Sequence, residues 1–156
     1  MNIPTMSQRD SRWASEKLGN SKTLTIGTDG CALVCLTMLL NYVGYAETPP
    51  TVNANLKKTK AFQGALIYWP NVQKAYPKIK FVWRGGKYEN ARVASQIYLK
   101  NMPVLVQVDF DGTDKKDFRH WVLFKGFMKA NDPWTGKEIS TNFYKPLLGY
   151  SLFSRV

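Results

Sequence analysis

Cys31 and His120 could together form a thiol nucleophile and its base. Cys31 opens the apolar run Cys31–Tyr42, which follows Gly30 and is predicted to be a buried helix. Free N–H groups and the positive end of the helix dipole favour the nucleophilic thiolate at a helix start. His120 is the only histidine, and an imidazole is the side chain best able to take a thiol proton near neutral pH. Packing for Cys31 and a surface or capping role for His120 are the alternatives.

Two further positions could complete such a site. Asn131 and Asp132 follow the predicted strand that begins after His120, and a strand followed by a turn brings either of them back as the group that orients the imidazole. Trp134 could then shield the pair from water. An ordinary β-turn with a capping Asp132 is the alternative. Gln8 could donate from its side-chain amide to an oxyanion, although an isolated glutamine is equally compatible with a surface role.

The second cysteine is expected to be inert. Cys35 lies one helical turn after Cys31 in the middle of the apolar run, where burial penalises a charged thiolate. Two cysteines at this spacing match neither a disulfide framework nor a CxxC redox or zinc motif. We therefore expect no metal and no cofactor.

The rest of the chain predicts the elements that must position these residues. Helices are expected at Cys31–Tyr42, Thr51–Lys58 with Thr51 as its cap, Leu66–Tyr76 and Glu89–Asn101. Strands are expected at Lys80–Arg84, at Val104–Phe110 and Trp121–Met128 as an antiparallel pair around the polar loop Asp111–Arg119, and at Tyr150–Arg155, with a turn at Asn131–Gly136. Because helices lead and strands follow, the order predicts an α+β fold.

Length and composition are typical of one globular domain spanning residues 1–156. The 156 residues include 44% hydrophobic and 13% aromatic residues, too many for a disordered chain. Residues Met1–Pro4 lack the basic and apolar regions of a secretory signal, and the apolar stretch Ala32–Leu40 is too short to span a bilayer. We therefore expect a monomer that is synthesised in the cytoplasm and has no transmembrane segment.

The chain is strongly basic, with a net charge of +11 at pH 7. Such a charge attracts anionic polymers such as nucleic acid, membrane surfaces or cell-wall polymers. The basic residues are spread thinly, with Lys57–Lys60 and Lys115–Lys116 as the only clusters, and no nucleic-acid-binding motif is present. Specific nucleic-acid binding is therefore not expected, and a solvated basic surface is an equal alternative.

Several short motifs resemble one family when they are taken together. The chain is similar to the C39-like branch of papain-fold cysteine peptidases, on the motifs Gln8–Trp13, Leu18–Gly19, Ile26–Gly27, Gly30–Ala32 with Met38, His120–Leu123 and Asp132–Gly136. The resemblance implies a papain-like fold with the nucleophile helix packed on a C-terminal antiparallel sheet. It also implies a catalytic set of Gln8, Cys31, His120 and Asp132, in that order.

The expected activity is hydrolysis of peptide or amide bonds through this set. Proteins and the peptides of bacterial cell wall are both candidate substrates. The small size, the basic charge and the missing secretory signal favour cell-wall peptides as the substrate. A phage-type lysin, which acts on the wall after release from the host cell, has these properties. The alternative is a catalytically idle papain-like module whose basic surface binds an anionic polymer or a partner protein.

Overall fold

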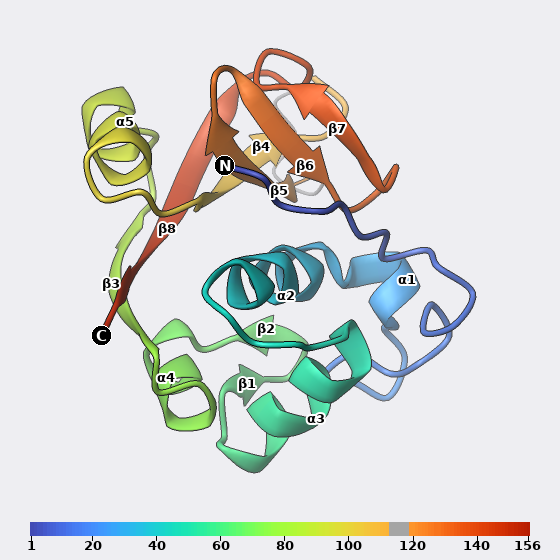
Figure 1. Cartoon of the computed structure of the whole chain (residues 1–156). Coiled ribbons are helices and arrows are strands. Elements are labelled where there is room, and N and C mark those ends of the chain that lie inside the picture. Colours follow the sequence, from blue (N-terminus) through green and yellow to red (C-terminus); the bar gives the residue numbers. More distant parts are fainter. Residues whose placement is uncertain (113–118) are drawn as a thin grey trace.

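The computed structural model describes residues 1–112 and 119–156, and the Lys115–Lys116 pair lies outside this described part. Its helices are α1 (Ile26–Asp29), α2 (Cys31–Tyr42), α3 (Pro49–Lys58), the 3₁₀ helix η1 (Trp69–Asn71), α4 (Val72–Ala75) and α5 (Asn90–Tyr98). Its strands are β1 (Phe62–Gln63), β2 (Leu66–Ile67), β3 (Ile79–Gly85), β4 (Val104–Asp109), β5 (Arg119–Gly126), β6 (Lys129–Asp132), β7 (Lys137–Ser140) and β8 (Leu147–Arg155). This mixture of helices and antiparallel sheet agrees with the predicted α+β class (Figure 1).

The main sheet orders its strands β3-β8-β4-β5-β6-β7, and every neighbouring pair is antiparallel. The predicted pairing of the two central strands is confirmed, with Val108 of β4 opposite His120 of β5. The last strand, β8, inserts between β3 and β4. Residues more than sixty positions apart therefore become neighbours in the sheet, which positions the charged groups discussed below.

Helix α2 is the centre of the molecule, as its apolar sequence predicts. It lies between the sheet and a layer made of α3, α4 and the β1–β2 hairpin (Figure 1). All eight residues from Leu33 to Leu40 are buried, and full burial of one large apolar side chain contributes roughly 1.5–3 kcal/mol. The opposite face of the sheet is covered by α5, through Val93 and Ile97. Packing on all sides holds the first residue of α2 in a fixed position.

One predicted helix has a different structure. The segment predicted as a helix at Leu66–Tyr76 instead contains β2, the 3₁₀ helix and the short α4, with Pro70 in the first turn of the 3₁₀ helix. Leu66 pairs with Gln63 across a turn in which Gly64 has φ 62°. A helix-like spacing of apolar residues over a short run does not distinguish these alternatives.

Helix α3 begins earlier than predicted, because Thr48 and not Thr51 is its N-cap. The side chains of Thr48 and Thr51 form a reciprocal capping box. The prolines at positions 49 and 50 occupy the first turn, where the missing N–H group is not needed. The prediction treated those prolines as preceding the helix.

Two boundaries of predicted elements also move. The predicted helix Glu89–Asn101 is shorter, because α5 spans Asn90–Tyr98 and Asn101 has φ 50°, outside the helical range. The predicted turn at Asn131–Gly136 consists of the end of β6 and the turn of residues 133–136 that leads to β7. Asn131 and Asp132 therefore lie in a strand, so their side chains point to opposite faces of the sheet.

Among the described residues, no helix is long and apolar enough to cross a membrane.

Candidate active site

Cys31 is the first residue of α2 and is partly exposed, whereas the residues from Leu33 to Leu40 are buried. Gly30 ends α1 and serves as the N-cap of α2. A Cβ atom at Gly30 would collide with the backbone of Ile26, so only glycine allows the two helices to meet so closely. The thiol therefore lies at a helix N-terminus, where backbone N–H groups and the helix dipole favour a negative charge.

His120 links Cys31 to Asp132. Strands β5 and β6 pair Leu123 with Asn131, and continuing this register places Asp132 diagonally across from His120 on the same face. The Nε2 atom of His120 lies 2.7 Å from Oδ1 of Asp132. The side chain of Cys31 lines the same cleft as the imidazole and interacts with it electrostatically. Because Nε2 faces Asp132, Nδ1 is the ring nitrogen left for the thiol.

The carboxylate of Asp132 is fully buried and is held by four donors. Oδ1 accepts from Nε2 of His120 and from the backbone N–H of Trp134 at 2.9 Å. Oδ2 accepts from the hydroxyl of Tyr144 at 2.7 Å and from that of Thr135 at 3.1 Å. Burial alone would raise the pKa of Asp132, but the hydrogen bonds from His120 and Tyr144 lower it below its ordinary value. Asp132 is therefore a fixed negative charge beside the imidazole.

The imidazole of His120 is stabilised in its charged form. Burial opposes the charge, but hydrogen bonds to Asp132 and Cys31 outweigh it and raise the pKa of His120 to about 9. The rings of Phe110 and Tyr144 lie 4.9 and 5.5 Å from the imidazole, between centroids. These rings limit the access of water to the charged pair, which strengthens its electrostatic interactions.

Gln8 is buried against the same site. Its Nε2 donates to the carbonyl oxygen of Gly27 at 3.1 Å, and its backbone N–H donates to the carbonyl oxygen of Pro133 at 2.8 Å. One N–H of the amide remains available to a ligand, since a side-chain amide has two. Within the described residues, its Oε1 has no hydrogen-bond partner. The N-terminal segment is thus fixed between α1 and the turn after Asp132.

These residues line one open cleft of about 820 Å³. Gln8, Cys31, His120 and Trp134 contribute the polar end of the site. The apolar lining includes Leu18, Leu24, Leu66, Ile67, Trp69 and Trp121, and the charged lining consists of Asp29, Arg84 and Arg119. A cleft with apolar walls and a few polar groups at one point is typical of a substrate site.

A comparison with protein families identifies the family of the chain. The family model described as "Peptidase_C39 like family" matches residues 1–151 of the 156-residue chain. The chain belongs to the Peptidase_C39-like family. The resemblance inferred from the motifs is therefore confirmed, and membership supports a peptidase function of the cysteine type. Neither a curated protein nor a solved structure matches the chain significantly.

The structure separates the two candidate orienting residues of this C39-like chain. Asp132 contacts His120, whereas Asn131 points to the other face of β6. The side-chain amide of Asn131 donates to the carbonyl oxygen of Ile3 at 2.8 Å and lies 3.6 Å from the sulfur of Met38. Asn131 therefore fixes the N-terminal segment against α2 and does not reach the imidazole.

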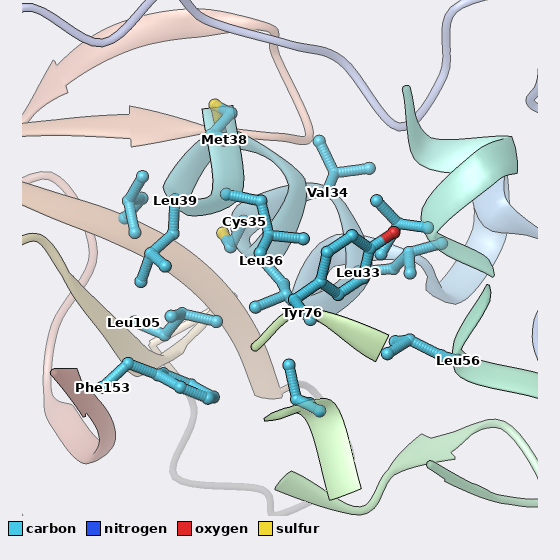
Figure 2. Close-up of a cluster of buried hydrophobic side chains, with 14 of the residues drawn as sticks. Leu33, Val34, Cys35, Leu36, Met38, Leu39, Leu56, Tyr76, Leu105 and Phe153 are labelled. Carbon is cyan, nitrogen blue, oxygen red and sulfur yellow. The ribbon is translucent and has the colours of Figure 1, made fainter. Parts of the chain in front are cut away.

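The two cysteines of the C39-like domain differ in environment. Cys35 is fully buried among the leucines of α2 and its neighbours (Figure 2). Burial first, and then the charges of Cys31 and Asp132, raise the pKa of the Cys35 thiol well above its ordinary value. Its sulfur lies 3.5 Å from the carbonyl oxygen of Trp121. Cys35 is consequently a packing residue that cannot readily form a thiolate.

Sequence reasoning missed Tyr144, which lies between β7 and β8 and donates to Asp132. Burial and the neighbouring carboxylate raise the pKa of Tyr144, so its hydroxyl stays protonated as a donor. Trp134 was expected to shield the site. Its ring centroid lies 5.5 Å from that of Phe110, and Phe110 is the ring that contacts His120. No fixed spacing from His120 marks Tyr144 or Phe110 in the sequence.

We expect Tyr144→Phe to weaken the site without removing its packing. The variant keeps the ring but deletes the 2.7 Å hydrogen bond to Asp132, and a hydrogen bond to a charged group contributes about 1.5–3 kcal/mol. The free energy of unfolding should fall by about that amount, and the acid limb of the pH–activity profile should move to higher pH as the pKa of Asp132 rises. Tyr68→Phe, at an exposed position, is the control. An unchanged acid limb would contradict this role.

The raised pKa of His120 also predicts how stability depends on pH. The folded state holds the imidazole proton more tightly than the unfolded state, whose pKa is near 6.5. The resulting stabilisation is fully present below pH 6.5 and is lost as the pH rises through about 9. Relative to His120→Gln, the wild type should lose about 3 kcal/mol over this window. Urea unfolding from pH 6 to 10 measures the difference, and parallel curves for the two proteins would refute the prediction.

Proposed function

We propose that this chain is a papain-like cysteine peptidase or amidase with Cys31 as nucleophile, His120 as base and acid, and Asp132 as the residue that orients His120. The observation that carries the proposal is the 2.7 Å contact between His120 and the buried Asp132, with Cys31 at the start of α2 in the same cleft as the imidazole. A nucleophile, a base within hydrogen-bonding reach and a third group that orients the base are the elements of covalent acyl transfer. The helix that carries the thiol packs on the antiparallel sheet that carries the base.

The proposed reaction has two steps. The thiolate of Cys31 attacks the carbonyl carbon of the substrate, and the carbonyl oxygen takes the negative charge. The backbone N–H of Cys31 and the free N–H of the Gln8 amide donate to that oxygen. His120 then gives its proton to the leaving amine, so that a thioester remains on Cys31. Water activated by His120 hydrolyses the thioester and restores the thiol.

Charge favours the peptides of bacterial cell wall as substrate. The chain carries a net charge of +11 at pH 7, and attraction to an anionic polymer raises the local concentration of enzyme at its surface. A hydrolase site in a strongly basic chain fits the role of a phage-type lysin best. A protein substrate is the other outcome that the test below distinguishes.

A paired activity screen tests the proposal. The purified protein is incubated with cell-wall preparations and, separately, with unfolded proteins, and new amino groups and fragments are measured by mass spectrometry. We expect release of wall peptides that increases at low salt, because screening weakens attraction between exposed charges. If only unfolded proteins are cleaved, the substrate is protein and the assignment to cell-wall peptides is wrong. If neither class is cleaved while the protein is folded, the hydrolase proposal fails and a binding module remains.

A further inference from the structure

Arg84 of β3 is placed in the cleft by contacts with three strands. Its Nη2 donates to Oε1 of Gln107 on β4 at 3.0 Å, and its Nη1 donates to the carbonyl oxygens of Gly85 and, at 3.4 Å, Tyr150. Strand β8 lies between β3 and β4, so the side chain must cross it. It crosses at Gly149, where a Cβ atom would lie 2.5 Å from Nη1 of Arg84.

The guanidinium of Arg84 also packs on a residue of the catalytic strand. It lies 4.9 Å from the ring centroid of Trp121, and Trp121 directly follows His120 in β5. Arg84, Trp121 and His120 line the same cleft as Cys31. Stacking on an aromatic face and bonding to an amide fix the orientation of a guanidinium. The charge of Arg84 is therefore presented at a defined place in the cleft that contains Cys31.

Arg84 forms no ion pair among the described residues, and Asp29 is the one acidic side chain of that part of the chain that lines the same cleft. The three hydrogen bonds of Arg84 go to carbonyl and amide oxygens. A second cation, Arg119, lines the same cleft. Burial and, after it, the charge of Arg119 lower the pKa of Arg84. Among residues 1–112 and 119–156, two of its five N–H groups have no acceptor and can bind a ligand.

We propose that Arg84 and Arg119 bind a carboxylate of the substrate close to the bond that Cys31 attacks. This inference rests on the proposed function and adds the substrate class, which is an acidic peptide. A guanidinium fork matches the two oxygens of a carboxylate. A partly desolvated cation beside a second cation is relieved by an anion, whereas a neutral amide in the same place supplies no compensating charge.

Alkylation of Cys31 by matched reagents tests the inference without a known substrate. The probes are the N-iodoacetyl derivatives of glutamic acid α-amide and glutamine α-amide, which differ only in one side-chain carboxylate. The aspartate and asparagine pair tests a shorter reach. Modification of Cys31 is followed by mass spectrometry, with the buried Cys35 as internal reference. We expect the carboxylate reagent of at least one pair to react roughly tenfold faster or more, as for a hydrogen bond between charged groups.

The variants assign this preference to the two arginines. In Arg84→Gln the ratio of the two rates should fall to about one, and Arg119→Gln should lower it partly. Gly149→Ala should lower it as well, because the added Cβ displaces both the guanidinium and the Gly85 carbonyl oxygen that it binds, while no charge is removed. Arg155→Gln removes an arginine that stacks on Tyr42 outside the cleft and should keep the wild-type ratio. Circular dichroism establishes that each variant is folded.

The outcomes separate this inference from the proposed function. If neutral iodoacetamide fails to label Cys31 in the folded protein, the nucleophile assignment itself fails. If it labels Cys31 but both reagent pairs give equal rates in the wild type, only the carboxylate site is refuted. A preference that survives Arg84→Gln and Arg119→Gln, or that is lost equally in Arg155→Gln, refutes it too, because the effect would then come from net charge. High salt should weaken a true preference.

Discussion

Replacement of Cys31 by alanine should reduce hydrolysis of any accepted substrate by a factor of about 10⁴ or more. The substitution removes the only thiol of the chain that faces the cleft, so no covalent intermediate can form. It removes little packing, because Cys31 is partly exposed at the helix start. The variant should therefore remain folded and bind substrate. Initial rates of product release, measured beside the wild type at the same substrate concentration, give the factor.

Cys35→Ala is the matched control for this prediction. Cys35 is buried in the cluster of Figure 2, so its loss leaves a small cavity and should lower the free energy of unfolding by about 1 kcal/mol. Activity should persist, since the Cys35 thiol is held protonated by burial. Loss of activity in Cys35→Ala with full activity in Cys31→Ala would contradict the assignment of the nucleophile.

Asp132→Asn should reduce kcat/KM by about 10³, which corresponds to about 4 kcal/mol of transition-state stabilisation. The asparagine has nearly the same shape, so the hydrogen bonds to Trp134, Thr135 and Tyr144 can be retained in large part. The negative charge that holds the imidazolium of His120 disappears. The pKa of His120 should fall, so that less imidazolium is available at neutral pH to protonate the leaving amine.

The pH dependence of alkylation separates this electrostatic role from a purely structural one. At mildly acidic pH, Cys31 of the wild type should react with iodoacetamide much faster than Cys31 of Asp132→Asn. Asp10→Asn is the control, because it makes the same chemical change in an aspartate paired with Arg12 at the surface. Equal alkylation and activity in Asp132→Asn and Asp10→Asn would show that Asp132 does not act on His120.

Local sequence was sufficient where neighbours along the chain determine the structure. The run from Cys31 to Tyr42 is helical over the predicted range, because its apolar residues require burial on all sides. The paired strands around His120 follow from β-branched and aromatic runs on both sides of a polar loop. The helix predicted from Leu66 to Tyr76 was wrong, because a short apolar run fits a helix and a hairpin equally.

The sequence by itself was sufficient to select the candidate base and the candidate nucleophile. A single histidine leaves His120 as the only imidazole, and the start of an apolar helix distinguishes Cys31 from Cys35. The short motifs were sufficient to predict the family, which the match over residues 1–151 confirms. These features depend on composition and on local patterns, so they can be recognised without knowledge of long-range contacts.

Only the tertiary structure decided how the other groups are placed. The choice between Asn131 and Asp132 depends on the parity of β6, since adjacent residues of a strand face opposite sides. Tyr144 reaches Asp132, and Arg84 reaches Gln107 across Gly149, through pairings between strands far apart in the chain. Such register has no local signal, because it is selected by burial of the whole sheet. The position of Cys31 at the start of the central helix could therefore be predicted, whereas the charges that line its cleft could not.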